Sequence, residues 1–248
     1  MKKSALSSLV VLLIWTASPG QRTEWQRIDD ELTAAFINLL DADYDTRADS
    51  LAPLFKKQLL AHLANPVTFN NSLDNLAKYV VIQSSADKKL KFYSWDDLTG
   101  GTWHHITTVA QFLTDEGKIV AQPLNPEDEM ETGEFTDCLI YEVHDLAADG
   151  TRYYLTFGRG THGSGNQHSV IRIFRISGGQ LMECADCFAP DLERAIEYPR
   201  TGNLNLAFNP ETNEITYNEY QWDDETGRNK LTGQIVTLKL TNGKFIRK

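Results

Sequence analysis

From Tyr79 to its end the chain alternates strand-length apolar runs with short turn sequences, and this pattern constrains the fold more than any other feature. Turns between antiparallel strands need residues that tolerate positive φ, and Asp-Gly, Gly-Gly and Asn-Gly pairs supply them at 149–150, 178–179 and 242–243. Runs of β-branched and aromatic residues between such turns are typical of strands. We therefore expect a mainly β fold built as an antiparallel meander.

The meander carries an internal repeat. YSWDDLTGG at 93–101 has a near copy, YQWDDETGR, at 220–228, and eight residues of the first block recur 127 positions later. A middle block has the same order of runs and turns with different residues. We expect about twelve strands in three four-stranded units, at about 79–122, 138–184 and 203–247, within a β domain of residues 79–248. The pattern leaves propeller-like, barrel and sandwich arrangements open.

Residues 21–66 predict an α-helical hairpin in front of the β domain. Thr23 followed by Gln26 is a capping box, and apolar residues then recur at helical spacing over about 24–40. A second helix is expected to start at Asp49 or Ser50 and to end before Asn65 and Pro66. Its expected buried residues are Leu51, Leu54, Phe55, Leu59 and Leu63.

Residues 1–20 have the composition of a secretory signal peptide. Lys2 and Lys3 precede an uncharged apolar run that is short for a membrane span, and small residues follow it. We expect a periplasmic or secreted protein with no membrane insertion after cleavage. Loss of the two lysines moves the formal charge from −10 to −12. An acidic surface repels phosphate backbones, which argues against nucleic acid as a partner.

Three cysteines lie in the expected mature chain: Cys138, Cys184 and Cys187. Two of them are expected to form a disulfide in an oxidising compartment, and the sequence leaves open whether Cys138 takes part or the CADC pair closes on itself. A redox-active CxxC pair is expected at the start of a helix that follows a strand. The flanks GGQLMECADCFAPD predict a strand running into a loop, so a structural bridge is favoured.

Around the first copy of the repeat, SSADKKLKFYSWDDLTGGTWHH resembles a group of uncharacterised secreted bacterial proteins that share a YSWDxxTGGT signature. The resemblance extends from LAPLFKKQLLAHL to YYLTFGRG and IRIFRI. It implies secretion and a β-rich fold, and it assigns no activity or catalytic residue.

The WDDxTG sequence falls where the second strand of a unit turns into the third. A structural role is favoured there, because the carboxylates accept backbone hydrogen bonds in Asx turns, glycine supplies positive φ and tryptophan covers the end of the sheet. At the matching place the middle unit has FGRGTHGSGNQH, 157–168, which predicts a long glycine-rich loop.

If the units pack side by side, these second turns share one rim, and loops displayed by a rigid sheet often bind ligands. The candidate binding residues come from all three units. They are Trp95, Asp96, Asp97, His104, His105, Arg159, His162, Asn166, His168, Trp222, Asp223, Asp224 and Arg228.

Catalytic and metal sites have weaker support in the sequence. No HExxH spacing is present, and Ser164 lacks the strand–turn–helix setting of a nucleophile. His144 and Asp145 are read as the end of a strand. The segment DADYDTRADSLA imitates a calcium loop, but Thr46 stands where glycine makes the bend and Ala52 where a carboxylate closes the shell. We expect no catalytic residue, metal or cofactor.

These observations favour a non-catalytic binding protein that uses the loop rim to hold a protein, peptide or glycan. One alternative is a metal-dependent hydrolase with a histidine and carboxylate site at the same rim. Another is a structural envelope or inhibitory protein.

Overall fold

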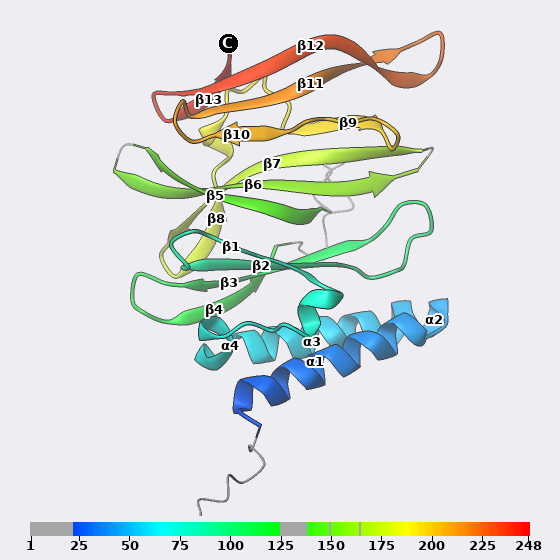
Figure 1. The fold of residues 1–248 in the computed structure, drawn as a ribbon, viewed down its shortest axis with the longest axis vertical. Helices are drawn as coiled ribbons and strands as arrows, with labels where there is room; N and C mark the ends of the chain where they lie inside the picture. The colour runs from blue at the N-terminus through cyan, green and yellow to red at the C-terminus, as the bar shows by residue number, and fades with distance from the viewer. Residues whose placement is uncertain (1–21, 125–137, 149, 164) are drawn as a thin grey trace, which may run out of the picture.

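The computed structural model describes residues 22–124, 138–148, 150–163 and 165–248. Within them the chain forms four layers, a helical layer at one end followed by three antiparallel sheets in chain order (Figure 1). We call the sheets A (β1–β4), B (β5–β9) and C (β10–β13). The expected mainly β fold with three four-stranded meanders and N-terminal helices is confirmed. Strand orders are open, and the sheets stack face to face as in a sandwich. The predicted signal peptide lies outside the described residues.

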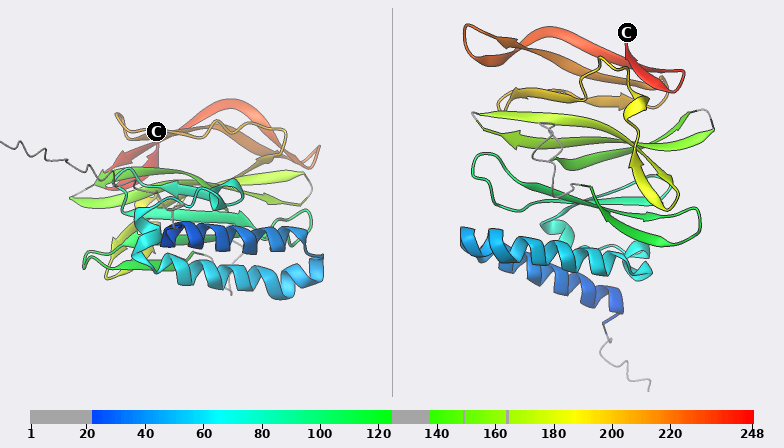
Figure 2. Two further views of the ribbon diagram at one scale, coloured as in Figure 1. Left: turned by 60° about the horizontal axis from the view of Figure 1, so that its bottom comes forward. Right: turned by 180° about the vertical axis from the view of Figure 1, so that it is seen from behind.

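The helical layer contains two long helices, α1 (Glu24–Asp41) and α3 (Ala52–Leu63), which lie side by side beneath sheet A (Figure 2). The ring centroids of Phe36 on α1 and Phe55 on α3 are 5.0 Å apart. Both helices begin and end close to the predicted positions, but Leu54 is exposed, so its expected burial is wrong. Between and after them lie α2 (Tyr44–Thr46), a π-helical turn (Arg47–Leu51), α4 (Pro66–Asn70) and a 3₁₀ turn (Leu76–Lys78).

The predicted calcium-loop imitation is a set of helical turns. Asp43 caps α2 by accepting the backbone N–H of Thr46 at 2.9 Å, whereas α3 has Leu51 at its N-cap and no side-chain cap. The Arg47 guanidinium donates to four backbone carbonyls, three at the end of α1 and the fourth that of Leu98 in the β2–β3 turn. Arg47 thereby satisfies carbonyls that a helix end leaves unpaired and fixes the β2–β3 turn to the helical layer.

Sheets A and C repeat the same four-stranded plan. The strands of sheet A are β1 (Val81–Ser84), β2 (Leu90–Asp96), β3 (Ile106–Leu113) and β4 (Ile119–Pro123). The strands of sheet C are β10 (Ala207–Asn209), β11 (Glu214–Asp223), β12 (Arg228–Thr241) and β13 (Lys244–Arg247).

Sheet B has longer strands and one strand more than predicted. Its strands are β5 (Leu139–Ala148), β6 (Thr151–His162), β7 (Asn166–Ser177), β8 (Gln180–Glu183) and β9 (Ala195–Pro199). The expected long loop at 157–168 is wrong, because β6 and β7 pair as far as His162 and Asn166 and leave a short connection. Strand β9, which pairs with β7, was not predicted because its apolar run is brief and lacks a partner nearby in sequence.

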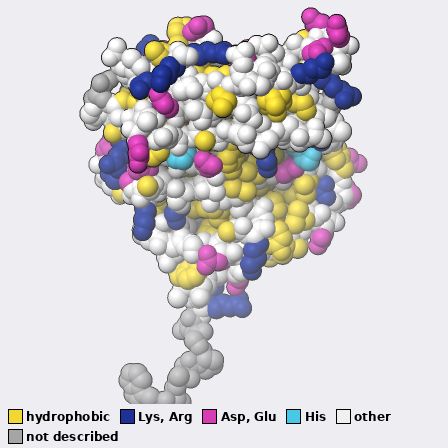
Figure 3. All heavy atoms as spheres, turned by 45° about the horizontal axis from the view of Figure 1, so that its top comes forward, with side chains coloured by type: hydrophobic (Ala, Val, Ile, Leu, Met, Phe, Trp, Pro, Cys, Tyr) yellow, Lys and Arg dark blue, Asp and Glu magenta, His cyan; other side chains and the backbone are white. Residues whose placement is uncertain are grey.

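Apolar clusters fill the three spaces between layers. One lies between the helices and sheet A, and it includes Phe55, Tyr93 and Trp95. The second lies between sheets A and B and includes Phe92 and Phe174, and the third lies between sheets B and C. Both faces of sheets A and B are therefore covered, whereas sheet C turns one face to solvent. The view onto sheet C shows charged side chains of both signs interspersed with apolar ones (Figure 3).

A buried amide joins sheet A to the helical layer. The side chain of Gln111 on β3 is fully buried, and its Oε1 accepts from the Tyr93 hydroxyl at 2.9 Å. Its Nε2 donates to the Leu63 carbonyl at 2.6 Å and to the Thr68 hydroxyl at 2.9 Å. One side chain thus satisfies polar groups from a strand, the end of α3 and α4.

Replacement of Gln111 by alanine is expected to lower the free energy of unfolding by about 3 kcal/mol, because it leaves buried polar groups without partners and opens a cavity. Urea denaturation measures the change. Gln221→Ala, at an exposed position on β11, is the matched control and is expected to change stability by less than about 0.5 kcal/mol. Equal effects of the two substitutions would contradict the role of the buried network.

Candidate functional site

The second turns of the three sheets lie on the same side of the stack, as the sequence predicts (Figure 1). They are the β2–β3 turn at 97–105, the β6–β7 turn at 163–165 and the β11–β12 turn at 224–227. The first two turns are joined by hydrogen bonds, and the third belongs to the end sheet. Each turn is built by different local bonds, which decide what it can present.

The first turn uses both carboxylates of the WDD sequence. Asp96 Oδ1 accepts the backbone N–H of Leu98 at 2.7 Å, which closes an Asx turn. Asp97 is buried, and its carboxylate accepts from Trp95 Nε1 and from the Thr107 hydroxyl, each at 2.6 Å. Gly100 has φ +86°, and a Cβ there would lie 2.2 Å from the carbonyl oxygen of Trp103, so only glycine fits.

The third turn has similar but not identical bonds. Asp223 Oδ1 accepts the backbone N–H of Thr226 at 3.0 Å, and Asp224 accepts from Trp222 Nε1 at 3.0 Å. Gly227, the counterpart of Gly100, also has positive φ. The other oxygen of Asp223 forms an ion pair with Lys230. The expected structural role of WDDxTG as a turn is thus confirmed in both copies.

The two tryptophans differ in what covers them. Trp95 is 1% exposed, and the ring of Phe55 from α3 meets it edge to face at 5.1 Å. Trp222 is 58% exposed, because no helical layer packs beneath the outer part of β11. The same local motif is therefore a core element in sheet A and a surface element in sheet C.

We predict that Trp95→Ala lowers the free energy of unfolding by about 3–5 kcal/mol, since it empties a packed site and removes a donor from buried Asp97. Its internal control, Trp222→Ala, is expected to change stability by less than about 0.5 kcal/mol. Thermal and urea denaturation of both variants tests the pair. A large loss at Trp222 would show that the third turn is a core element as well.

The first two turns and the β9–β10 connection are cross-linked, and we call this surface the A/B rim (97–105, 161–163, 165–166 and 200–206). Arg200 Nη2 donates to the Thr102 carbonyl at 2.7 Å, and its Nε donates to the Asn166 carbonyl at 3.2 Å. The backbone N–H of His104 donates to the Thr161 hydroxyl at 3.3 Å. Bonds between segments far apart in sequence hold the A/B rim in one arrangement.

Two groups stand out on the A/B rim. Trp103 is 47% exposed although it lies within a bonded turn. His104 Nδ1 hydrogen-bonds to Asp96 Oδ2, and both side chains are partly exposed. An aromatic ring beside an imidazole–carboxylate pair offers a stacking face, hydrogen-bond donors and a negative charge on one surface.

Several predicted rim residues lie elsewhere. His168 is buried at 1% exposure within β7, opposite Gly160 and Glu197, so its placement in an exposed loop is wrong. Arg159 lies along β6 opposite Leu139, away from the turn.

Trp95 and Asp97 are buried at the first turn, with 1% and 7% exposure, so their prediction as contact residues of the rim is wrong. The other predicted rim residues lie at or near the turns. His162 ends β6, and Asn166 begins β7 and donates to Glu197 at 2.8 Å. His105 lies in the first turn, where its carbonyl accepts the Asp97 backbone N–H. Arg228 is exposed at the start of β12. Ser164 lies outside the described residues.

Sequence reasoning missed Trp103 and Arg200. Trp103 follows Gly100, Gly101 and Thr102, and an aromatic residue so close to a double glycine was a usable signal of display on a turn. Arg200 lies in YPRTGN, which predicts a turn but not the partner 98 residues away.

The described part of the A/B rim holds no cluster of metal-binding side chains. Among the described residues, no group of three or more His, Cys, Asp or Glu side chains is arranged to hold a metal ion. Two hollows, of about 360 and 280 Å³, lie elsewhere, beside Trp25 on α1 and beside Phe174 between sheets A and B. None of the helices in the described part of the chain is long and apolar enough to cross a membrane.

Comparison with known proteins adds no further assignment: no protein-family model, curated protein or solved structure matches the chain.

The pKa values of two carboxyl groups are shifted in opposite directions, that of the buried Asp97 upward and that of the partly buried Asp87 downward. Burial raises the pKa of Asp97 above its ordinary 3.8, although Thr107 and Trp95 donate to it. Burial acts in the same sense on Asp87 in the β1–β2 turn, but hydrogen bonds from Ser85, Lys89, Arg152 and Tyr154 outweigh it and lower that pKa below 3.8. Asp87 lies on the opposite edge of the stack, where it bonds β6 of sheet B to sheet A.

The Asp97 shift predicts a stability loss as pH rises. Just above pH 3.8 the native state keeps a proton that the unfolded state releases, so the free energy of unfolding falls until pH passes the folded pKa. The asparagine side chain of Asp97→Asn does not titrate, so the variant lacks this pH-dependent contribution to the free energy of unfolding. The stability of the wild-type protein relative to Asp97→Asn is therefore expected to decrease as pH rises through that window, as measured by urea denaturation.

Asp87→Asn is the control of opposite sign. Its native pKa is depressed, so the wild-type advantage over Asp87→Asn is present above pH 3.8 and is lost as pH falls below it. The same trend for both variants would contradict the assignment of burial as the dominant effect on Asp97.

Proposed function

We propose that this chain is an extracytoplasmic, non-catalytic binding protein that holds a protein, peptide or glycan on the A/B rim. The observation that carries the proposal is the cross-linking of that rim. Arg200 joins the β2–β3 and β6–β7 turns through backbone carbonyls, and Arg47 anchors the first of these turns from the helical side. A surface fixed before binding loses little conformational entropy when a ligand arrives.

The chemistry of the A/B rim suits an extended ligand. Exposed Trp103 supplies a face for a sugar ring or an apolar side chain, while the Asp96–His104 pair supplies polar contacts beside it. The two described hollows lie away from these residues, so a chain that lies across the turns fits better than a small enclosed molecule.

The metal-dependent hydrolase has less support. A catalytic metal needs about three protein ligands and an open position. The Asp96–His104 pair supplies two candidate ligands, and no third one is grouped with them among the described residues. Burial of His168 within β7 removes one of the imidazoles that the sequence placed at the rim.

Screening the purified protein against immobilised glycans and a displayed peptide library tests the proposal. Trp103→Ala is expected to weaken the selected ligand by at least about 10-fold, as exposed aromatic residues at binding surfaces commonly do. Ile246→Ala on β13 is the control, because Ile246 is 39% exposed and lies on a strand of sheet C that contributes no segment to the A/B rim.

Unchanged binding by Trp103→Ala, with the melting temperature also unchanged, would place the binding surface elsewhere. Absence of any glycan or peptide ligand for the wild-type protein would favour the structural envelope alternative.

A further inference from the structure

The disulfide of this chain joins Cys184 to Cys187, so the CADC pair closes on itself. Cys138 is buried and is not part of a disulfide. With a sequence separation of 3, the bond ties no two sheets together. A disulfide that closes so small a loop restricts the unfolded chain less than one that closes a long loop. Its position therefore calls for an explanation other than cross-linking of the fold.

The pair sits where a strand passes into a helical turn. Strand β8 ends at Glu183, Cys184 follows at once, and the 3₁₀ turn Ala185–Cys187 comes next. The sequence predicted a strand running into a loop, and the structure agrees with this apart from the single 3₁₀ turn. Redox-active CxxC pairs also lie after a strand and at the start of a helix, although their helix is longer than this single turn.

The backbone around the pair is held without the sulfur atoms. The N–H of Cys184 donates to the Ile173 carbonyl at 2.7 Å, and the N–H of Cys187 donates to the Cys184 carbonyl at 3.2 Å. Beyond the turn, the ring of Phe188 stacks on that of Phe245. Opening the disulfide leaves all these contacts in place, so reduction does not require unfolding.

The two cysteines differ in accessibility. Cys184 is half-buried, whereas Cys187 is 4% exposed and belongs to the core between sheets B and C. Exposed neighbours flank the first sulfur along the chain: Met182 on β8 offers an apolar contact, and Ala185 follows within the turn. An attacking thiol can approach Cys184, and Cys187 is placed as the leaving sulfur beneath it.

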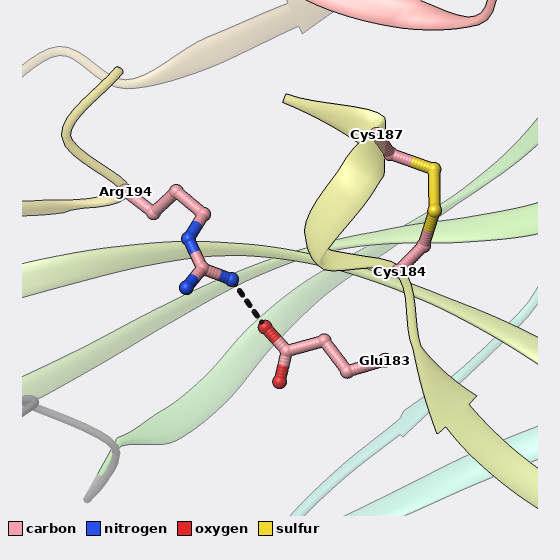
Figure 4. The surroundings of a disulfide bond; sticks show 4 residues. All are labelled: Glu183, Cys184, Cys187 and Arg194. Carbon is pink, nitrogen blue, oxygen red and sulfur yellow. Dashed lines mark hydrogen bonds and ion pairs between the residues drawn. A yellow bond between two sulfur atoms is a disulfide. The ribbon is translucent and has the colours of Figure 1, made fainter. Parts of the chain in front are cut away.

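Charges next to the pair are largely balanced. The Glu183 carboxylate accepts from Arg194 at 2.8 Å (Figure 4). It also accepts from Arg172 at 2.6 Å. Two guanidinium groups therefore offset the one carboxylate that directly precedes Cys184. Asp186 within the turn is exposed to solvent, where its charge is screened.

We propose that the Cys184–Cys187 disulfide is a thiol–disulfide exchange site whose substrates are dithiols on other proteins. A partner thiolate attacks Cys184 Sγ, the bond to Cys187 breaks, and Cys187 leaves as a thiolate that takes up a proton. The partner's second thiolate then attacks its own sulfur in the mixed disulfide and releases Cys184. The partner is oxidised to a disulfide by loss of two electrons and two protons, and the pair is reduced to two thiols. The reverse reaction reduces a partner disulfide.

The first test is reduction of the folded, oxidised protein by dithiothreitol without denaturant, followed by alkylation and mass spectrometry. Alkylation of Cys184 and Cys187 is expected while circular dichroism stays native and Cys138 remains unmodified. Reduction that occurs only under conditions that also unfold the chain or expose Cys138 would overturn the proposal.

The second test compares Cys187→Ser with Cys184→Ser. Both variants lack the disulfide, so each is the stability control of the other. Mixed-disulfide formation with glutathione disulfide is expected to be at least about 10-fold faster for Cys187→Ser, which retains the half-buried Cys184. Equal rates, or faster reaction of Cys184→Ser, would overturn the assignment of Cys184 as the attacked sulfur. The wild-type reduction remains decisive if either variant fails to fold.

Discussion

Apolar residues on both faces of sheets A and B determine how the molecule is assembled. Strand β3 is buried along almost its whole length and β7 is buried over its central residues 168–174, whereas β11 in sheet C alternates buried and partly exposed positions. A sheet with two apolar faces is stable in water only when both are covered, so A and B must lie inside the stack. Sheet C, with one polar face, ends the stack on one side, and the amphipathic helices end it on the other.

Buried polar groups then fix how the layers sit on one another. Apolar packing alone tolerates small shifts, but a buried donor or acceptor that loses its partner costs free energy. Gln111 sets sheet A against the helices. At the partly exposed β1–β2 edge, Asp145 of sheet B accepts the backbone N–H groups of Ala86 and Asp87 at 3.0 and 3.1 Å, which also sets sheet A against sheet B. These bonds place the β1–β2 edge opposite the A/B rim and keep both edges in register.

The repeated WDD turn shows how one local motif acquires two roles. Its hydrogen bonds are made within a few residues of the chain, so they form in both copies. What differs is the neighbouring layer: α3 covers Trp95, and no layer covers Trp222. The hydrogen bonds of the first turn are made by its own residues and their neighbours on the strands. Its outward groups Trp103 and His104 are not needed for these bonds, so we propose that they contact a ligand.

The sequence by itself determined the features that depend on short chain segments: the two helices with the capping box of α1, the strand and turn order of the meander, and the carboxylate-stabilised turns at Asp96 and Asp223. Periodicity and turn chemistry act over a few residues, so they can be read without the fold. The tertiary structure decided the rest. It buried His168 within β7, added β9 beside β7, chose the pairing of Cys184 with Cys187, and brought Arg200 to Thr102. Each of these outcomes depends on which distant segment packs alongside, and that is settled by covering apolar faces and satisfying buried polar groups across the whole chain.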